Sequence, residues 1–287
     1  MENSAERKAA SGEGDIEREK EELEDAAEEE SVDEAASLAP RLIYEVIRRD
    51  GDEELARPMS SLVWSGVAAG ILISFSVLGE AVFRSHMEDT PTRHLVENLG
   101  YSFGFLLVIL GRMQLFTENT LTTVLPVIAD PRPKVVGRML RLWSVVLAAN
   151  VAGAFAAAAV MAFTSAIPGE ILTAIGELSH HAMDVTPGEA FSRGIPAGVL
   201  VASIVWMVPQ ARQAAFFVIL VFTWLIAAGD FTHVVAGSVE MAFLMLTGAV
   251  GVIPAIGGFF LPVLAGNIVG GTAIFALLVY AQVKEEI

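Results

Sequence analysis

Two polar interruptions occur inside long apolar stretches of this chain. Residues 115–120 read LFTENT, and residues 229–233 read GDFTH. A helix inside hydrocarbon is interrupted only where protein or an aqueous cavity satisfies the freed N–H and C=O groups, because lipid cannot. Helices that restart at such a break direct unpaired N–H groups and a positive dipole end toward the gap. The two breaks therefore predict a binding site for a small anion halfway through a membrane.

Two side chains in these breaks have chemistry suited to an anion. Thr117 supplies a hydroxyl that can donate or accept a hydrogen bond, and His233 is the only histidine within the predicted spans. An imidazole, with an ordinary pKa of ~6.5, can exchange a proton with a weak acid. The alternatives are a helix-terminus cap for Thr117 and a packing role for His233. We favour function for the histidine, because ionisable groups at this depth usually have one.

Three charged residues accompany the breaks, namely Arg112, Glu118 and Asp230. They either line a pore or form a buried structural network. We favour the network, because an unpaired charge in hydrocarbon is too costly. The four other histidines lie in predicted outer loops, and their spacing does not set up a tetrahedral metal site. The sequence predicts neither a metal site nor a cofactor.

The elements that must position these residues are membrane spans. The chain is 54% hydrophobic with a mean hydropathy of +0.57, and several apolar runs approach the ~20 residues that cross a bilayer. Two predicted helices are too long for one uninterrupted span, which independently supports the breaks. The predicted helices are residues 60–83, 97–129 (broken at 115–120), 139–163, 190–208, 212–248 (broken at 229–233) and 257–281.

The distribution of charge predicts the orientation. With the N-terminus inside, the predicted inner segments hold ten Lys and Arg residues and the outer ones three, which places both termini in the cytoplasm. Residues 1–57 contain 20 acidic and 8 basic residues, and the rest of the chain contains 14 and 10. The net charge of −16 therefore belongs mostly to the N-terminal segment and says little about a pore.

Four regions follow from this pattern. Residues 1–37 are predicted to be an acidic, disordered cytoplasmic tail, because they have no apolar face large enough to offset the entropy of ordering. Residues 38–57 have the apolar spacing of an amphipathic helix, either on the membrane surface or as a plain linker. Residues 58–283 form the predicted six-span domain, and residues 284–287 a cytoplasmic C-terminus.

Three short matches recur in the same order in segments 60–163 and 190–281. SGVAAG at 65–70 matches RGIPAG at 193–198, FT at 116–117 matches FT at 231–232, and NVAG at 150–153 matches NIVG at 267–270. Each half holds three predicted spans, an odd number, so the second half must enter the membrane with opposite topology. The sequence thus predicts two inverted three-helix repeats with a path on their pseudo-two-fold axis.

Residues 104–120 (GFLLVILGRMQLFTENT), with AAGDFTHVVAGS at 227–238 and PVLAGNIVGG at 262–271, resemble the formate/nitrite transporter family. The resemblance covers roughly residues 55–283. It implies an all-α membrane protein with six spans in an aquaporin-like arrangement. It also implies a homopentamer in which each protomer has one pore for small monovalent anions such as formate, nitrite or hydrosulfide.

The same resemblance implies roles for individual residues. Thr117 would face His233 across the narrowest part of the pore, aromatic and aliphatic side chains would form apolar constrictions, and Asn267 would support the histidine region or line the central chamber. The implied pore residues are Thr117, His233, Tyr101, Phe105, Leu115, Phe116, Ile226 and Asn267, and the secondary candidates are Arg112, Glu118, Asn119, Asp230 and Asn150.

The chain also departs from the family's pattern. Gln114 stands where many members have an acidic residue, Thr232 precedes the histidine where many have glutamate, and Val234 follows it where many have serine. Arg112 occupies a position that is commonly small. These departures bear on the choice of anion more than on the fold.

We predict a channel or transporter for small weak-acid anions in a prokaryotic inner membrane. The expected partners are the anion, protons, membrane lipid and further copies of the chain, and not nucleic acid. An enzyme is not expected, because the chain has no Walker A, His-Glu-x-x-His or Gly-x-Ser-x-Gly sequence and no cysteine for thiol chemistry. A neutral-solute channel of the aquaporin type would carry Asn-Pro-Ala triplets, which both breaks lack. A proton-coupled symporter stays open, because the same residues could serve it.

Overall fold

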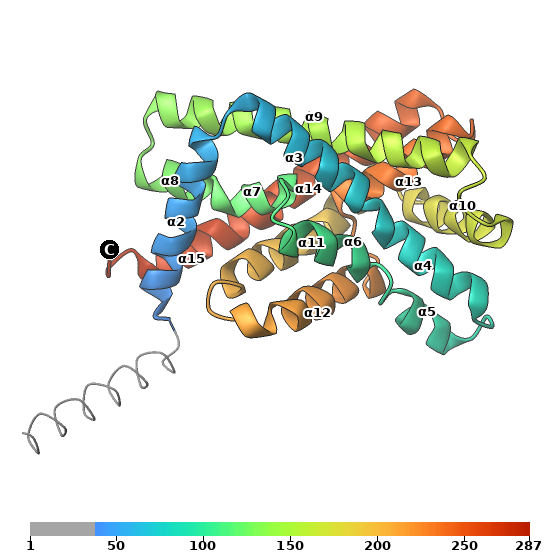
Figure 1. The fold of residues 1–287 in the computed structure, drawn as a ribbon. Coiled ribbons are helices and arrows are strands. Elements are labelled where there is room, and N and C mark those ends of the chain that lie inside the picture. Colours follow the sequence, from blue (N-terminus) through green and yellow to red (C-terminus); the bar gives the residue numbers. More distant parts are fainter. Residues whose placement is uncertain (1–37) are drawn as a thin grey trace, which may run out of the picture. The chain divides into compact units, whose positions relative to one another are not determined.

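The computed structural model describes residues 38–287, so the predicted acidic tail at 1–37 lies outside the described residues (Figure 1). Every regular element in residues 38–287 is a helix. Four of them are long and apolar enough to cross a membrane. These are α3–α4 (Met59–Leu72 and Ser74–His86), α9 (Pro133–Phe163), α11 (Pro187–Met207) and the run Pro254–Val283, which comprises η2 (Pro254–Phe260), α14 (Leu261–Ile268), η3 (Val269–Ala276) and α15 (Leu277–Val283).

The broken helices lie between these long elements. The first consists of α6 (Ser102–Leu110), then α7 (Phe116–Thr122) and α8 (Val124–Ala129), with the short α5 (Pro91–Glu97) before it. The second consists of η1 (Arg212–Ala214) with α12 (Ala215–Ala228), then α13 (Val234–Leu246). The second break therefore spans residues 229–233, as the sequence predicted.

The first break lies at residues 111–115, and the predicted position at 115–120 is wrong. Glu118, Asn119 and Thr120 are part of α7. Polar side chains are compatible with a buried helix here because they bond back to its own carbonyls: the Thr120 hydroxyl donates to the Thr117 carbonyl at 2.7 Å. The interruption comes from the residues just before, which include Gly111 and Arg112.

Besides the short α5, two helices lie outside the predicted spans. The amphipathic segment forms α2 (Pro40–Ala56), with Ile43, Tyr44 and Ile47 buried on one face. On its other face Arg48 and Arg49 hold the pKa of the Glu45 carboxyl down to about 2 through hydrogen bonds. Helix α10 (Gly169–Met183) occupies what the sequence treated as an outer loop, and it packs against α4 and α13.

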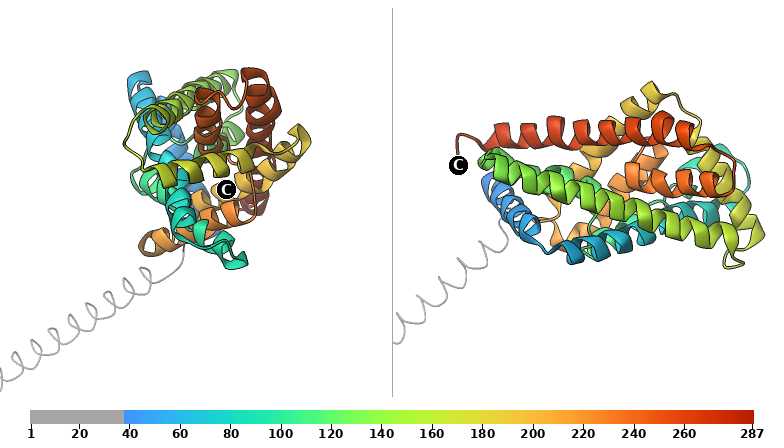
Figure 2. Two further views of the ribbon diagram at one scale, coloured as in Figure 1. Left: turned by 90° about the vertical axis from the view of Figure 1, so that its right-hand side faces the viewer. Right: turned by 90° about the horizontal axis from the view of Figure 1, so that it is seen from above.

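Glycines allow the long helices to approach closely at two places. Helix α3 packs on α9, where a Cβ on Gly70 would lie 2.0 Å from the Asn150 carbonyl oxygen. Helix α11 packs on α14, where a Cβ on Gly198 would lie 2.3 Å from the Asn267 carbonyl oxygen. Figure 2 shows α9 and the C-terminal run roughly alongside one another with opposite chain directions. The close contacts bring an asparagine from each of these helices to the broken segments.

Candidate pore site

The two breaks have the same backbone conformation. Arg112 and Asp230, 118 positions apart, both adopt φ 52°, a left-handed conformation that residues other than glycine rarely occupy. In each break the N–H of the following residue donates to the carbonyl five residues earlier, at 3.0 Å in the first and 2.9 Å in the second. The internal repeat read from the sequence aligned Phe116 with Phe231. The offset of 118 positions between the two left-handed residues aligns Phe116 with Val234 instead. Strained backbone that recurs in this way is typical of functional segments.

Asn150 of α9 satisfies the first break. Phe116 is the first residue of α7, and its backbone N–H donates to Asn150 Oδ1 at 2.9 Å. Asn150 Nδ2 donates to the carbonyls of Gln114 and Gly66, both at 2.8 Å. Asn150 is fully buried, so these bonds replace those that lipid cannot offer.

Asn267 of α14 satisfies the second break in the same way. Its Oδ1 accepts from the N–H of Val234 at 2.8 Å, and its Nδ2 donates to the carbonyls of Thr232 and Gly194, both at 2.9 Å. The sequence placed Asn267 near the histidine but treated Asn150 only as a secondary candidate. The matching Asn-x-x-Gly segments were the signal that both residues have one structural task.

The breaks bring Thr117 and His233 together. Thr117 Oγ1 lies 2.8 Å from His233 Nε2, and both side chains are buried. His233 Nδ1 accepts a hydrogen bond from the N–H of Ala236 at 3.3 Å and so caps α13. Because Nδ1 accepts, the neutral ring carries its hydrogen on Nε2 and donates it to Thr117. The hydroxyl hydrogen of Thr117 is then available to another acceptor.

Aromatic and aliphatic side chains surround this contact. The ring of Phe105 meets the imidazole of His233 edge-on, with centroids 5.0 Å apart, and the ring of Tyr101 lies 5.2 Å from that of Phe105. Leu115 and Ile226 are fully buried. Phe116 belongs to a different contact, because its ring packs on Trp143 of α9 with centroids 5.6 Å apart.

Two cavities approach the Thr117–His233 contact. One of about 340 Å³, the Glu80 vestibule, lies at the α5/α10 end and is lined by residues that include Glu80, Tyr101 and His233. The other, of about 550 Å³, is the Arg112 vestibule at the α2 end, lined by residues that include Arg112 and Leu115. Phe105, Thr117 and Ile226 line neither cavity. All three are fully buried, and both Phe105 and Thr117 contact the imidazole of His233.

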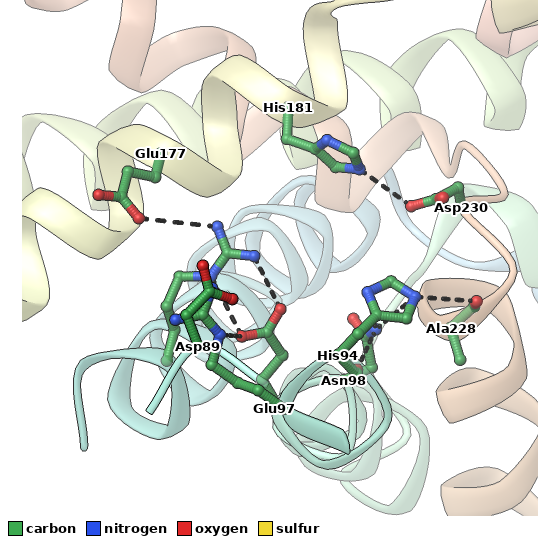
Figure 3. A network of polar contacts seen from close by, with 10 residues as sticks. Asp89, His94, Glu97, Asn98, Glu177, His181, Ala228 and Asp230 are labelled. Atoms are coloured by element: carbon green, nitrogen blue, oxygen red, sulfur yellow. Dashed lines mark hydrogen bonds and ion pairs between the residues drawn. The ribbon is translucent and has the colours of Figure 1, made fainter. Parts of the chain in front are cut away.

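The predicted buried network of Arg112, Glu118 and Asp230 is wrong. Arg112 and Glu118 line the Arg112 vestibule, where Asn119 lies beside them, and Asp230 lines the Glu80 vestibule. Within residues 38–287 the three form no ion pair with one another; Asp230 instead contacts His181 Nε2 at 3.1 Å (Figure 3). The charges can stay in the membrane segment because each faces open space that water can fill.

A buried ion cluster at the Glu80 vestibule was not predicted. Glu97 is 2% exposed, and its carboxylate binds Arg84 at 2.7 Å and Arg93 at 3.4 Å. Arg84 also lies 3.8 Å from Glu177 of α10 (Figure 3). The residues of this ion cluster come from α4, α5 and α10. Only Arg93 and Glu97 lie within one helix, so only their spacing could be recognised in the sequence.

Comparison with known proteins identifies the family of this fold. The profile described as formate/nitrite transporter matches residues 41–281. This chain belongs to the formate/nitrite transporter family. The resemblance seen in the sequence is thereby confirmed, and membership makes the chain a membrane transport protein rather than an enzyme.

Individual formate/nitrite transporter relatives agree with this assignment. The inner membrane protein YfdC of Escherichia coli is 43% identical over 95% of this chain and 88% of its own length. The formate channel FocA of Haemophilus influenzae is 30% identical over 75% of this chain and 84% of its own length.

Two solved structures share the fold. A pentameric formate channel with formate bound has a TM-score of 0.69 and 24% identity, covering 79% of this chain and 98% of that protein. An ion channel of the same family has a TM-score of 0.71 and 20% identity, covering 85% and 98%.

Proposed function

We propose that this protein passes small monovalent weak-acid anions, such as formate, nitrite or hydrosulfide, across a bacterial inner membrane. The observation that carries the proposal is the buried Thr117–His233 contact of 2.8 Å, in which His233 lines the Glu80 vestibule. Relatives described as a formate channel and as an inner membrane protein support the substrate class and the location.

The residues at the centre favour an anion over a neutral solute. An anion must shed water there, and fixed donors must replace it. The hydroxyl hydrogen of Thr117 is such a donor, oriented by the Nε2–H of His233, and α13 begins directly after His233. The anion is strongly hydrogen-bonded or protonated at this point, and it then passes Phe105 and Ile226 as a nearly neutral species.

We further propose the architecture that this pathway requires. Six spans form two inverted three-helix repeats, in which the breaks meet at the midplane. Support comes from the equal backbone conformations of the breaks and from Asn150 and Asn267, which make the same three bonds. Both termini are cytoplasmic by the charge of the loops. A homopentamer with one pore in each protomer is supported by the pentameric formate channel of similar fold.

The test is uptake by purified full-length protein in liposomes, with a panel of formate, nitrite, hydrosulfide, water and glycerol. Thr117→Val removes a donor to a charged group worth ~1.5–3 kcal/mol, and His233→Ala removes the group that orients this donor, so anion uptake should fall by about 10–100-fold in each variant. Thr223→Val is the matched control, because the buried Thr223 hydroxyl donates only to carbonyls of its own helix.

Two results would contradict the proposal. Anion uptake that is the same in Thr117→Val, His233→Ala and the control would remove the site from the pathway. Rapid passage of water or glycerol with no anion uptake would favour the neutral-solute channel instead.

A further inference from the structure

Two buried carboxyl groups in the Glu80 vestibule have no partner. Glu80 of α4 and Glu240 of α13 line this cavity and are only 6% and 9% exposed. Neither side chain makes a hydrogen bond or an ion pair with any residue from 38 to 287. The helices that carry them pack against each other, and both carboxyls line the same cavity. Buried carboxylates without partners are costly, so this arrangement requires an explanation.

The basic groups that face these carboxyls are mostly engaged elsewhere. Arg84 lies one turn from Glu80, but its guanidinium binds Glu97 at 2.7 Å. Arg93, on α5 and outside the cavity lining, binds the same Glu97 and Asp89. Arg84 is the guanidinium group closest to Glu80 in the sequence of the described residues, and Glu97 already neutralises it.

The other faces of the cavity add little positive charge. Helix α11 contributes Arg193, and α10 contributes His181, which contacts Asp230. His94 of α5 contacts the carbonyl of Ala228 (Figure 3). With every acid ionised, four carboxylates face two guanidinium groups, so the entrance would repel an anion.

A tyrosine hydroxyl completes the cavity. Tyr101 is 7% exposed and lines the Glu80 vestibule, and its hydroxyl makes no hydrogen bond within residues 38–287. Its ring packs on Phe105, which in turn contacts the imidazole of His233. A free donor therefore lies on the way from the carboxyls to the pore centre, where it can bind an oxygen of a small anion.

His233 is poorly placed to be the first source of a proton. Its Nδ1 accepts from the N–H of Ala236, and its Nε2 faces Thr117. A second proton on the ring would need Nδ1 and would break the cap of α13. Two carboxyls in one cavity, by contrast, lower their mutual repulsion when one of them holds a proton.

We propose that Glu80 and Glu240 form a proton-donating carboxyl pair that neutralises the anion before it reaches His233. The inference rests on the proposed function and extends it. The O–H bond of one carboxylic acid breaks as a new O–H bond forms on the substrate. The carboxylate that is left takes a proton from water at the vestibule mouth. The neutral acid crosses and releases its proton to the water on the other side, so each anion moves with one proton and without net charge.

The experiment measures formate uptake and internal pH together, in liposomes that contain the full-length protein. The variants are Glu80→Gln, Glu240→Gln and the double variant, and Glu177→Gln is the control for charge at the same end of the protein. Glu177 is on α10, 60% exposed and outside the cavity lining. At neutral pH the double variant should take up formate about 100-fold more slowly, as expected when a positioned acid is lost. The difference should narrow at acidic pH, because solvent protons replace the pair. A purely structural role would not produce that dependence.

Three results would overturn the inference. The first is a double variant whose uptake has the same pH profile as that of the wild type. The second is formate entry into wild-type liposomes without an accompanying proton. Uptake of methylammonium that disappears in the double variant would instead make the pair a cation site.

An infrared spectrum without any anion separates this inference from the proposed function. The difference spectrum, wild type minus double variant, should show the carbonyl band of a protonated carboxyl, because the other carboxyls contribute equally to both proteins. If the band is present but no anion is transported, the proposed function fails and the carboxyl pair stands. If anions are transported but the band is absent, the carboxyl pair fails. The single variants should each weaken the band, which covers the case in which the double variant does not assemble.

Discussion

The asparagine that holds the second break offers a direct test of the structure. Replacing Asn267 with alanine removes three buried hydrogen bonds, to the N–H of Val234 and to the carbonyls of Thr232 and Gly194. At ~1 kcal/mol net for each bond, the free energy of unfolding should fall by about 3 kcal/mol. The average of ~0.6 kcal/mol for bonds between membrane helices gives about 2 kcal/mol. We therefore expect a loss of about 2–3 kcal/mol.

The assay is thermal unfolding of the purified protein in detergent, together with anion uptake in liposomes. For a domain of this size, 2–3 kcal/mol corresponds to a melting temperature roughly 4–12 °C lower. Asn150→Ala should give a similar loss, because Asn150 makes the same three bonds at the first break. Uptake should fall as well, since the break that carries His233 loses its support.

Ser238→Ala is the matched control. Ser238 is fully buried on α13, but its hydroxyl donates only to the Val234 carbonyl of the same helix, at 2.6 Å. Loss of this hydroxyl leaves no backbone group of the break without a partner. The free energy of unfolding should therefore fall by about 0.6 kcal/mol or less. If Asn267→Ala melts at the temperature of this control, the three bonds do not hold the break and the reasoning is refuted.

Two further substitutions test the packing and the ion cluster. Gly70→Ala should lower the free energy of unfolding by about 1–3 kcal/mol, because the new Cβ would lie 2.0 Å from the Asn150 carbonyl oxygen. In the control Gly169→Ala, the new Cβ has no atom within 4 Å, so the melting temperature should stay unchanged. Arg84→Met should destabilise by up to about 3–5 kcal/mol, because it leaves the buried Glu97 carboxylate with a weaker partner, and adding Glu97→Gln should restore most of the loss; equal stability of the single and double variants would count against the pair.

The sequence was sufficient to predict that the membrane domain is interrupted twice, but not the position of both interruptions or how each is built. Polar residues within an apolar run marked both breaks, and the second, ending at His233, was placed correctly. The first was placed too late, because hydropathy cannot tell a polar residue in a break from one inside a helix. Thr120 is helical because its hydroxyl bonds to its own backbone.

The position of the site was predicted from the family resemblance. The cavities and charges around the site could be predicted neither from the residue pattern nor from the resemblance. The resemblance placed Thr117 opposite His233, and their side chains lie 2.8 Å apart, while their role in transport stays a prediction. The charges near the breaks were assigned to a buried network, because a sequence shows a charge in an apolar run but not a cavity beside it. The partnerless Glu80 went unnoticed for the same reason: it lies near the end of a span, where a solvated charge is the ordinary expectation.

The left-handed residues of the two breaks give the pathway an electrical direction. The same backbone position holds a guanidinium, Arg112, in one vestibule and a carboxylate, Asp230, in the other. Opposite charges at equivalent positions create a field along the pathway, even though the backbone around them is alike. An anion that arrives from the α2 end passes the guanidinium of Arg112 before the centre, and one that arrives from the α5/α10 end passes the carboxylate of Asp230. Transport by this protein should therefore rectify, with unequal rates in the two directions under equal and opposite driving forces.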